Sequence, residues 1–127
     1  MNNYIVGNIF EVTSTRGWLY ELGDIIRLTG FKSGHVAWWE RLSDGLKSDG
    51  YMECATLNTQ NKYRVLVHHP SGAPVVTGDT VTICKINRDK AYNEYLDEKG
   101  RWWCIEPKDV KLIQEGQKES TVQLWPL

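Results

Sequence analysis

The sequence predicts an all-β protein made of two small modules in tandem. Three features indicate this fold class: an internal repeat, short stretches rich in β-branched and aromatic residues, and turn residues at intervals of roughly 8–12 positions. The repeat relates residues 10–28 to residues 65–83 without a gap, since each residue of the second stretch follows its counterpart by 55 positions. It aligns Gly23-Asp24 with Gly78-Asp79, and apolar residues with apolar residues. Two copies of one design favour two modules of one architecture.

The first module is predicted over residues 1–60. Residues 4–13 are expected to form a strand because they are rich in β-branched and aromatic side chains, and residues 25–29 form the next expected strand. Residues 51–57 alternate loosely between apolar and polar and are also expected to be a strand. Gly7 is expected to form a bulge, and Gly23-Asp24 a tight turn. Residues 36–42 (VAWWERL) fit either a strand or one short helix, because periodicity does not separate the two in a short apolar run. Residues 43–50 contain two Asp-Gly pairs and are expected to be a loop.

The second module is predicted over residues 61–114. Its expected strands cover residues 63–68, 80–87, 94–97, 101–106 and 110–113. Gly100 suits a hairpin turn between the third and fourth of these, and Pro107 begins a turn before the last. The polar stretch 58–62 (NTQNK) is the expected boundary between the modules. Because this linker is short, we expect the two modules to pack against each other.

A C-terminal tail over residues 115–127 follows the second module. Residues 115–120 are polar, whereas residues 121–125 (TVQLW) have the composition of an extra strand. The apolar side chains Val122, Leu124 and Trp125 need a surface to cover them. They would dock on the first module of the same chain, or add a strand to a partner or a second copy. The expected state is therefore a monomer, or a homodimer formed through this strand.

The second half resembles the SH3-like small barrel, in the broad sense that includes KOW-type modules. The resemblance rests on residues 78–83 (GDTVTI), the hairpin that ends at Gly100, residues 102–105 and the proline-led turn into residues 107–112. It implies two tandem SH3-like barrels with an extra C-terminal strand, covering about residues 10–113. It implies little about function, because this fold hosts many unrelated functions. The tyrosine-rich motif and acidic loop of peptide-binding SH3 domains are absent from the sequence.

The first half follows the SH3-like pattern only in part. It matches through Gly23-Asp24 and the strand after them. Setting Gly50 and Cys54 against Gly100 and Cys104 then leaves five extra residues in the first half. No counterpart to the proline-led turn is expected there.

Composition and charge exclude several classes of protein. Formal net charge is −1, and neither half is strongly basic: residues 1–61 carry five basic and seven acidic side chains, residues 62–127 ten and nine. A DNA-binding protein that relies on phosphate neutralisation normally shows more positive charge, although a local basic stripe remains open. No signal-peptide pattern and no apolar run of roughly 18 residues occurs. We therefore expect a cytoplasmic protein without a membrane partner.

Metal binding and catalysis are not expected. Cys54, Cys84 and Cys104 are widely spaced, form no zinc pattern and are expected to be reduced, mostly buried thiols. The neighbours His68 and His69 would point to opposite sides of a strand, so one metal ion does not easily take both. The sequence contains no P-loop, GxSxG, HExxH or GxGxxG motif. We expect a non-enzymatic protein without a cofactor.

Two tryptophan pairs, Trp38-Trp39 and Trp102-Trp103, are the strongest candidates for a binding surface. Neighbouring residues on a strand point to opposite faces, so one member of each pair should face outwards. We expect Trp39 and Trp102 to be the exposed members. The alternative is that both members of each pair are buried, one within a module and one between modules.

Basic and aromatic residues beside these pairs complete the candidate surface. The predicted partner-binding set is His35, Trp38, Trp39, Arg41, Arg88, Tyr92, Tyr95, Arg101, Trp102, Trp103 and Trp125. Exposed aromatic rings suit a protein partner, and small near-neutral chains without motifs are similar in style to phage-encoded proteins that inhibit or modulate a host protein. The alternative is a KOW-type DNA- or RNA-binding module that uses the 88–101 hairpin and the 108–111 edge. A structural role in an assembly also remains open.

Overall fold

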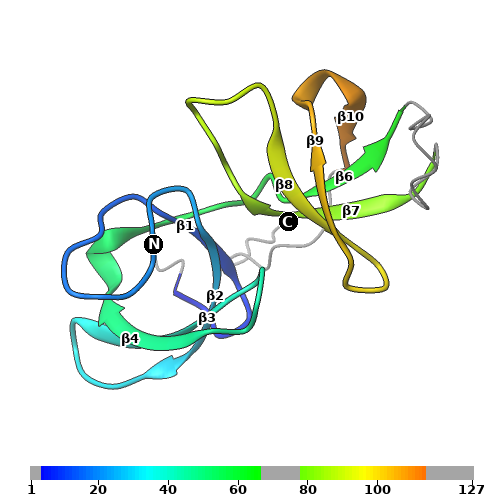
Figure 1. Ribbon diagram of the computed structural model, residues 1–127. Helices are drawn as coiled ribbons and strands as arrows, with labels where there is room; N and C mark the ends of the chain where they lie inside the picture. Colours follow the sequence, from blue (N-terminus) through cyan, green and yellow to red (C-terminus); the bar gives the residue numbers. More distant parts are fainter. Residues whose placement is uncertain (1–3, 67–77, 114–127) are drawn as a thin grey trace, which may run out of the picture.

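A computed structural model describes residues 4–66 and 78–113 of the chain. The described part is all-β and contains two five-stranded antiparallel sheets, one from each half of the sequence (Figure 1). The predicted fold class of two small β units is therefore confirmed. The predicted C-terminal strand and Trp125 lie outside the described residues.

Both sheets have the same strand order. The first sheet is ordered β4-β3-β2-β1-β5, and the second, read from its β9 edge, is ordered β9-β8-β7-β6-β10. In each sheet the first four strands along the chain are therefore neighbours in sequence order, and the fifth strand pairs with the first. The first sheet contains β1 (Ile9–Val12), β2 (Ile25–Phe31), β3 (Val36–Arg41), β4 (Lys47–Tyr51) and β5 (Ala55–Leu57). The second contains β6 (Lys62–Val65), β7 (Thr80–Lys85), β8 (Asn93–Asp97), β9 (Trp102–Ile105) and β10 (Val110–Leu112). Residues 58–61 join the two sheets, within the stretch that the sequence predicts as a boundary.

The two units are equivalent at their glycine turns, as the internal repeat predicts. The strands before these turns are related by an offset of 53 residues rather than 55. In each unit a valine accepts a hydrogen bond from the turn glycine: Gly23 N donates to Val12 O at 3.0 Å, and Gly78 N to Val65 O at 2.8 Å. The glycines are 55 positions apart and the valines 53. The gapless alignment is therefore wrong before the glycine. A shift of two residues keeps every side chain on its face of the strand, so apolar residues still align with apolar ones.

The repeat also extends further than the sequence indicates. A 3-10 turn, η1 (Met52–Cys54), precedes β5 just as η2 (Pro107–Asp109) precedes β10, and the two turns are 55 positions apart. The expectations that the first half lacks this turn, and that Gly50 and Cys54 match Gly100 and Cys104, are therefore wrong. Ala55 N donates to Met52 O to close η1, and this hydrogen bond requires no proline.

Two expectations about the middle of the first half are also settled. The ambiguous run 36–42 is a strand, β3. The expected loop at 43–50 is only half right: the turn at Asp44-Gly45 precedes β4, but residues 47–50 belong to β4 although they contain the pair Asp49-Gly50. Strand β4 pairs along its whole length with β3, and this long-range pairing overrides local turn preference.

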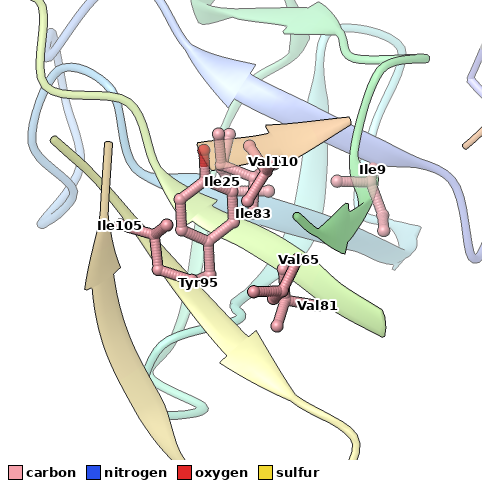
Figure 2. Close-up of a cluster of buried hydrophobic side chains, with 8 residues drawn as sticks. All are labelled: Ile9, Ile25, Val65, Val81, Ile83, Tyr95, Ile105 and Val110. Carbon is pink, nitrogen blue, oxygen red and sulfur yellow. The ribbon is translucent and has the colours of Figure 1, made fainter. Parts of the chain in front are cut away.

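The two units pack together through an apolar cluster (Figure 2). Ile9 and Ile25 belong to the first sheet, yet they lie in the buried cluster of the second unit beside Val65, Ile83 and Tyr95. Ile86 N, just after β7, donates a hydrogen bond to Gly23 O at 2.9 Å. The first unit has its own core, centred on Trp39 and Phe10. The junction is therefore packed rather than a free linker.

Candidate functional site

Two exposed aromatic rings lie on one face of the first sheet. Trp38 on β3 and Tyr51 on β4 keep 43% and 41% of their surface exposed. Val36 pairs with Tyr51 and Trp38 with Asp49, so these four side chains share the outer face of the sheet. We call this surface the β3–β4 face. Its rings come from adjacent strands, so one partner can contact both.

A cation covers each ring of the β3–β4 face. Lys32 Nζ lies 5.2 Å from the centre of the Trp38 ring, and the Arg16 guanidinium 5.5 Å from that of Tyr51. Each cation also forms an ion pair, Lys32 with Asp49 at 2.6 Å and Arg16 with Glu53. The hydrogen bond from Lys32 lowers the pKa of Asp49. The rings, cations and carboxylates thus hold one another in place before any partner binds.

Trp39 is buried, so its predicted place on the surface is wrong. None of its surface is exposed, and its Nε1 donates to Gly50 O at 3.2 Å. The ring meets Phe10 and Trp18 edge-on, with ring centres 5.3 and 5.8 Å apart. Trp39 stands opposite Leu28, whose side chain faces the core. Of this pair, the exposed member is Trp38.

The other two predicted residues of the first unit differ in their surroundings. His35 is exposed, next to the β3–β4 face, and its carbonyl accepts a hydrogen bond from Met52 N at 2.9 Å. Arg41 faces inwards and pairs with Asp24 at 3.1 Å and Asp44 at 2.6 Å. Its hydrogen bond to Asp44 raises the pKa of Arg41, and that bond is the main cause of the drop in the pKa of Asp44 to about 2. Arg41 is therefore a structural cation rather than part of the exposed surface.

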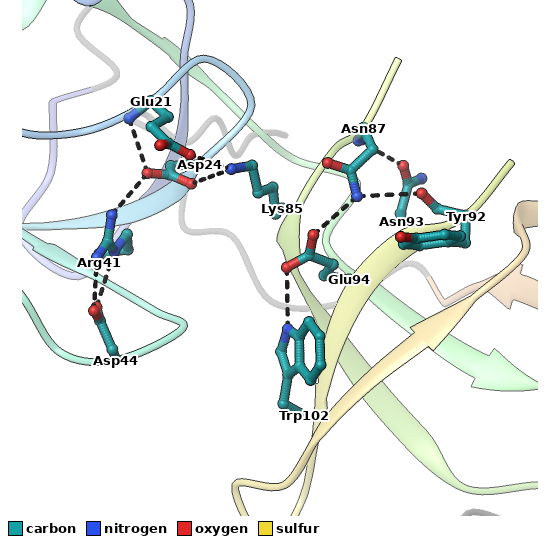
Figure 3. A network of polar contacts seen from close by, with 10 residues as sticks. All are labelled: Glu21, Asp24, Arg41, Asp44, Lys85, Asn87, Tyr92, Asn93, Glu94 and Trp102. Atoms are coloured by element: carbon teal, nitrogen blue, oxygen red, sulfur yellow. Dashed lines mark hydrogen bonds and ion pairs between the residues drawn. The ribbon is translucent and has the colours of Figure 1, made fainter. Parts of the chain in front are cut away.

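In the second unit Trp102 is exposed, as predicted, and forms a smaller surface on the β8–β9 hairpin. It keeps 54% of its surface exposed, and its Nε1 donates to Glu94 Oε1 at 3.1 Å (Figure 3). Trp103 is half-buried. Tyr95 is buried against Tyr63, with ring centres 5.6 Å apart, so its predicted partner contact is wrong. Tyr95 occupies the position in the second unit that Trp39 occupies in the first. Trp39 pairs with Leu28 and Tyr95 with Ile83, and in each sheet the register shifts directly after that residue.

Asp97 organises the β8–β9 hairpin. Its carboxylate accepts hydrogen bonds from Lys99 N at 2.9 Å, Arg101 N at 2.8 Å, Arg101 Nε at 2.8 Å and Trp103 Nε1 at 3.0 Å. Burial opposes the charged form, but the hydrogen bonds from Trp103 and Arg101 outweigh it and lower the pKa of Asp97 to about 2. Arg101, predicted as a partner contact, is thus engaged in holding the hairpin.

We expect Asp97 to make stability fall in acid. Its folded pKa lies below the value of about 3.9 for an unfolded aspartate. Its contribution, about 2 kcal/mol, is therefore present above pH 4 and is lost as the pH falls towards 2. Urea unfolding of Asp97→Asn between pH 2 and 6 should show lower stability at pH 6 and a flatter acid limb than the wild type. The neighbouring exposed Glu98→Gln is the control, and equal slopes in both variants would contradict this role.

A polar network crosses the junction between the units (Figure 3). Asp24, almost fully buried, accepts from Glu21 N at 3.0 Å and pairs with Arg41 and Lys85. Lys85 Nζ lies 3.5 Å from Asp24 and 2.6 Å from Glu21, and the hydrogen bond to Glu21 raises the pKa of Lys85. Arg88 forms a second ion pair across the junction, with Glu11. The predicted contact residue Arg88 is therefore an inter-unit residue.

A groove of about 700 Å³ opens beside this network. We call it the junction groove, and it is lined by Glu11, Val12, Thr13, Leu22, Gly23, Lys85, Ile86, Asn87, Arg88, Asp89 and Lys90. Leu22 is its most exposed apolar wall, with 60% of its surface accessible. Tyr92 is half-buried, and Nζ of the groove residue Lys90 lies over its ring, 5.7 Å from the ring centre. Apolar walls with a charged rim at a contact between units are typical of binding grooves.

Sequence reasoning missed Tyr51, Arg16 and the junction groove. Tyr51 joins Trp38 only through the pairing of β3 with β4, and the sequence places a loop where β4 lies. The groove depends on how the units dock, for which the sequence carries no local signal. Basic residues beside the aromatic ones were the available signal, and they indicated the Trp38-Trp39 pair without showing which of the two is exposed.

The structure shows the surroundings of the three cysteines and of the acidic and histidine side chains that could bind a metal ion. Cys54 and Cys84 are buried and Cys104 is exposed, all as free thiols. Within residues 4–66 and 78–113, no group of three or more His, Cys, Asp or Glu side chains is arranged to hold a metal ion. His68 and His69 lie outside these ranges.

The comparisons with known proteins identify no family. The sequence matches no family model, and no curated protein is similar to it. In the described part of the chain, no helix is long and apolar enough to span a bilayer.

Proposed function

We propose that this chain is a non-enzymatic binding protein that engages another protein through its β3–β4 face. The observation that carries the proposal is the pair of exposed rings, Trp38 and Tyr51, on one side of adjacent strands. A cation that is itself ion-paired lies over each ring. The shared strand order of the two sheets supports the wider proposal that both units are SH3-like barrels.

The energetics favour Trp38 as the anchor. Tryptophan, tyrosine and arginine dominate the hot spots of protein interfaces, where truncating one such residue often weakens binding by 2 kcal/mol or more. A ring already held by a cation loses little conformational freedom when a partner covers it. Trp38 lies over Gly30, because a Cβ at Gly30 would be 3.8 Å from the ring. The ring is thus supported by the backbone of β2 and by Lys32, and 43% of the surface of Trp38 still remains exposed to a partner.

The charge pattern favours protein over nucleic acid. The cations over the two exposed rings of the β3–β4 face are paired with carboxylates, Lys32 with Asp49 and Arg16 with Glu53. A phosphate that approached such a cation would meet the paired carboxylate as well, and the repulsion offsets the attraction. Lys108, on the edge proposed for a KOW-type contact, likewise lies 3.6 Å from Glu106 and 3.4 Å from Asp109. Mixed charges of this kind suit complementary pairing with a protein surface.

Coverage of the partner by this face would inhibit or redirect it. The function proposed in full is therefore modulation of a host protein, as in phage-encoded proteins that act inside bacteria. This part of the proposal rests on the size, near-neutral charge and motif-free sequence of the chain.

Affinity capture from a bacterial lysate, with and without nuclease, tests the proposal. We expect one protein to be retained in stoichiometric amount after nuclease treatment, and Trp38→Ala to lose at least about 30-fold in affinity for it, as removal of a 2 kcal/mol hot spot implies. The control is Leu19→Ala, which removes an exposed apolar side chain outside the face. Both variants should unfold in urea like the wild type.

The other outcomes separate the alternatives. If Trp38→Ala still bound the captured protein and Trp102→Ala did not, the binding site would lie on the β8–β9 hairpin instead. Captured material that disappears with nuclease, and binding that weakens steeply with salt, would replace the proposal with nucleic-acid binding.

A further inference from the structure

The junction groove offers an apolar surface that the described residues do not cover. Val12, Leu22 and Ile86 line it, and Leu22 is 60% exposed. Its volume, about 700 Å³, lies within the range typical of binding sites for small ligands and peptide side chains. This groove is separate from the β3–β4 face, since none of the residues that line it belongs to that face.

The groove continues towards the point where the described chain ends. A smaller hollow of about 250 Å³ shares Glu11, Ile86 and Arg88 with it and is also lined by Tyr63. Tyr63 pairs with Leu112 at the end of β10, and Ile113 N donates to Lys62 O at 2.8 Å. The chain therefore leaves the second sheet beside the smaller hollow.

The sequence beyond Ile113 has the composition of an occupant. Residues 114–120 (QEGQKES) are polar and span at most about 25 Å when fully extended. Residues 121–127 (TVQLWPL) are mainly apolar and contain no charged side chain. Three of the charged residues that line the groove already form ion pairs, Glu11 with Arg88 and Lys85 with Glu21, so an uncharged segment suits this surface. It displaces none of these pairs.

We propose that residues 121–127 of the same chain occupy the junction groove, with the side chains of Leu124 and Trp125 against Leu22 and Ile86. Tethering through seven residues gives the segment an effective concentration on the order of 1 mM, so a modest affinity is enough to fill the groove. The segment then bridges the two units, since the groove is lined by β1 and residues 22–23 on one side and residues 85–90 on the other. This inference does not depend on the proposed function.

Amide NMR spectra of the full-length protein test the inference. Trp125→Ala should shift the amides of the groove lining, such as Thr13, Gly23 and Asn87, and leave those of the β3–β4 face unchanged. Leu22→Ser, at an exposed position, should shift the Trp125 indole signal. Leu66→Ser is the matched control, because Leu66 is 43% exposed, does not line the groove and should leave that signal unchanged. A free peptide of residues 121–127, added to Trp125→Ala, should restore the wild-type positions.

Three results would overturn the inference. Trp125→Ala could leave the groove amides unchanged. The shifts could instead appear along β9, an outer strand of the second sheet, which would indicate strand addition there. Shifts in the groove that grow with protein concentration, together with a doubled mass, would assign the groove to the tail of a second copy.

Discussion

Replacement of Gly23 by alanine is expected to be among the most destabilising single substitutions in the protein. Gly23 has a φ of +88°, which an alanine adopts only at a cost of about 1–3 kcal/mol. A Cβ at this position would lie 2.2 Å from the carbonyl oxygen of Ile86. This oxygen belongs to the backbone just after β7, so the clash is relieved only if the units move apart. We expect overpacking to add about 1–3 kcal/mol, measured as a lower free energy of unfolding in urea.

Gly78→Ala is the matched control for this prediction. Gly78 occupies the equivalent turn of the second unit with a φ of +98°, but among the residues that the structure describes none lies within 4 Å of a Cβ built there. It should therefore show the backbone penalty without the clash. The difference between the two variants isolates the contact between units. Equal losses of stability would contradict a close approach of Gly23 to Ile86.

The sequence was sufficient to predict the two Gly-Asp turns and the fold class, because these depend on local chemistry. Gly23 and Gly78 both have positive φ, and the strands that follow them form as expected. Strand β4 was missed because its Asp49-Gly50 pair indicates a turn, and only pairing with β3 makes the segment extended. Turn η1 was missed because it lacks proline, although its backbone hydrogen bond is the same as that of η2.

The candidate site could be predicted only in part. Lysine and arginine beside aromatic residues led to the Trp38 region, but strand parity had to be guessed, and the guess was wrong for Trp38-Trp39 and right for Trp102. Arg88 and Arg101 are exposed basic residues, as expected from the sequence. Their carboxylate partners Glu11 and Asp97 depend on contacts between units and within a hairpin. Such pairing decides whether a cation is available to a partner, and composition does not reveal it.

Trp39→Ala is expected to unfold the first unit under conditions where the wild type is stable. The substitution removes the ring contacts with Phe10 and Trp18 and the hydrogen bond to Gly50 O. Truncation of a fully buried tryptophan costs about 3–5 kcal/mol, which is comparable with the whole stability of a small domain. The loss should appear in urea unfolding as a lower midpoint, or as an unfolded first unit in amide NMR spectra.

The adjacent Trp38→Ala is the most stringent control, because it removes the same side chain from the same strand. Its ring lies on the outer face and leaves no internal cavity when truncated, so the expected change is within about 0.5 kcal/mol. Two neighbouring tryptophans should thus separate two properties, stability at position 39 and partner binding at position 38. If Trp38→Ala proved as destabilising as Trp39→Ala, the ring would be part of the core, and the β3–β4 face would no longer be a candidate binding surface. If Trp39→Ala proved mild, the packing of the first unit around this ring would be incorrect.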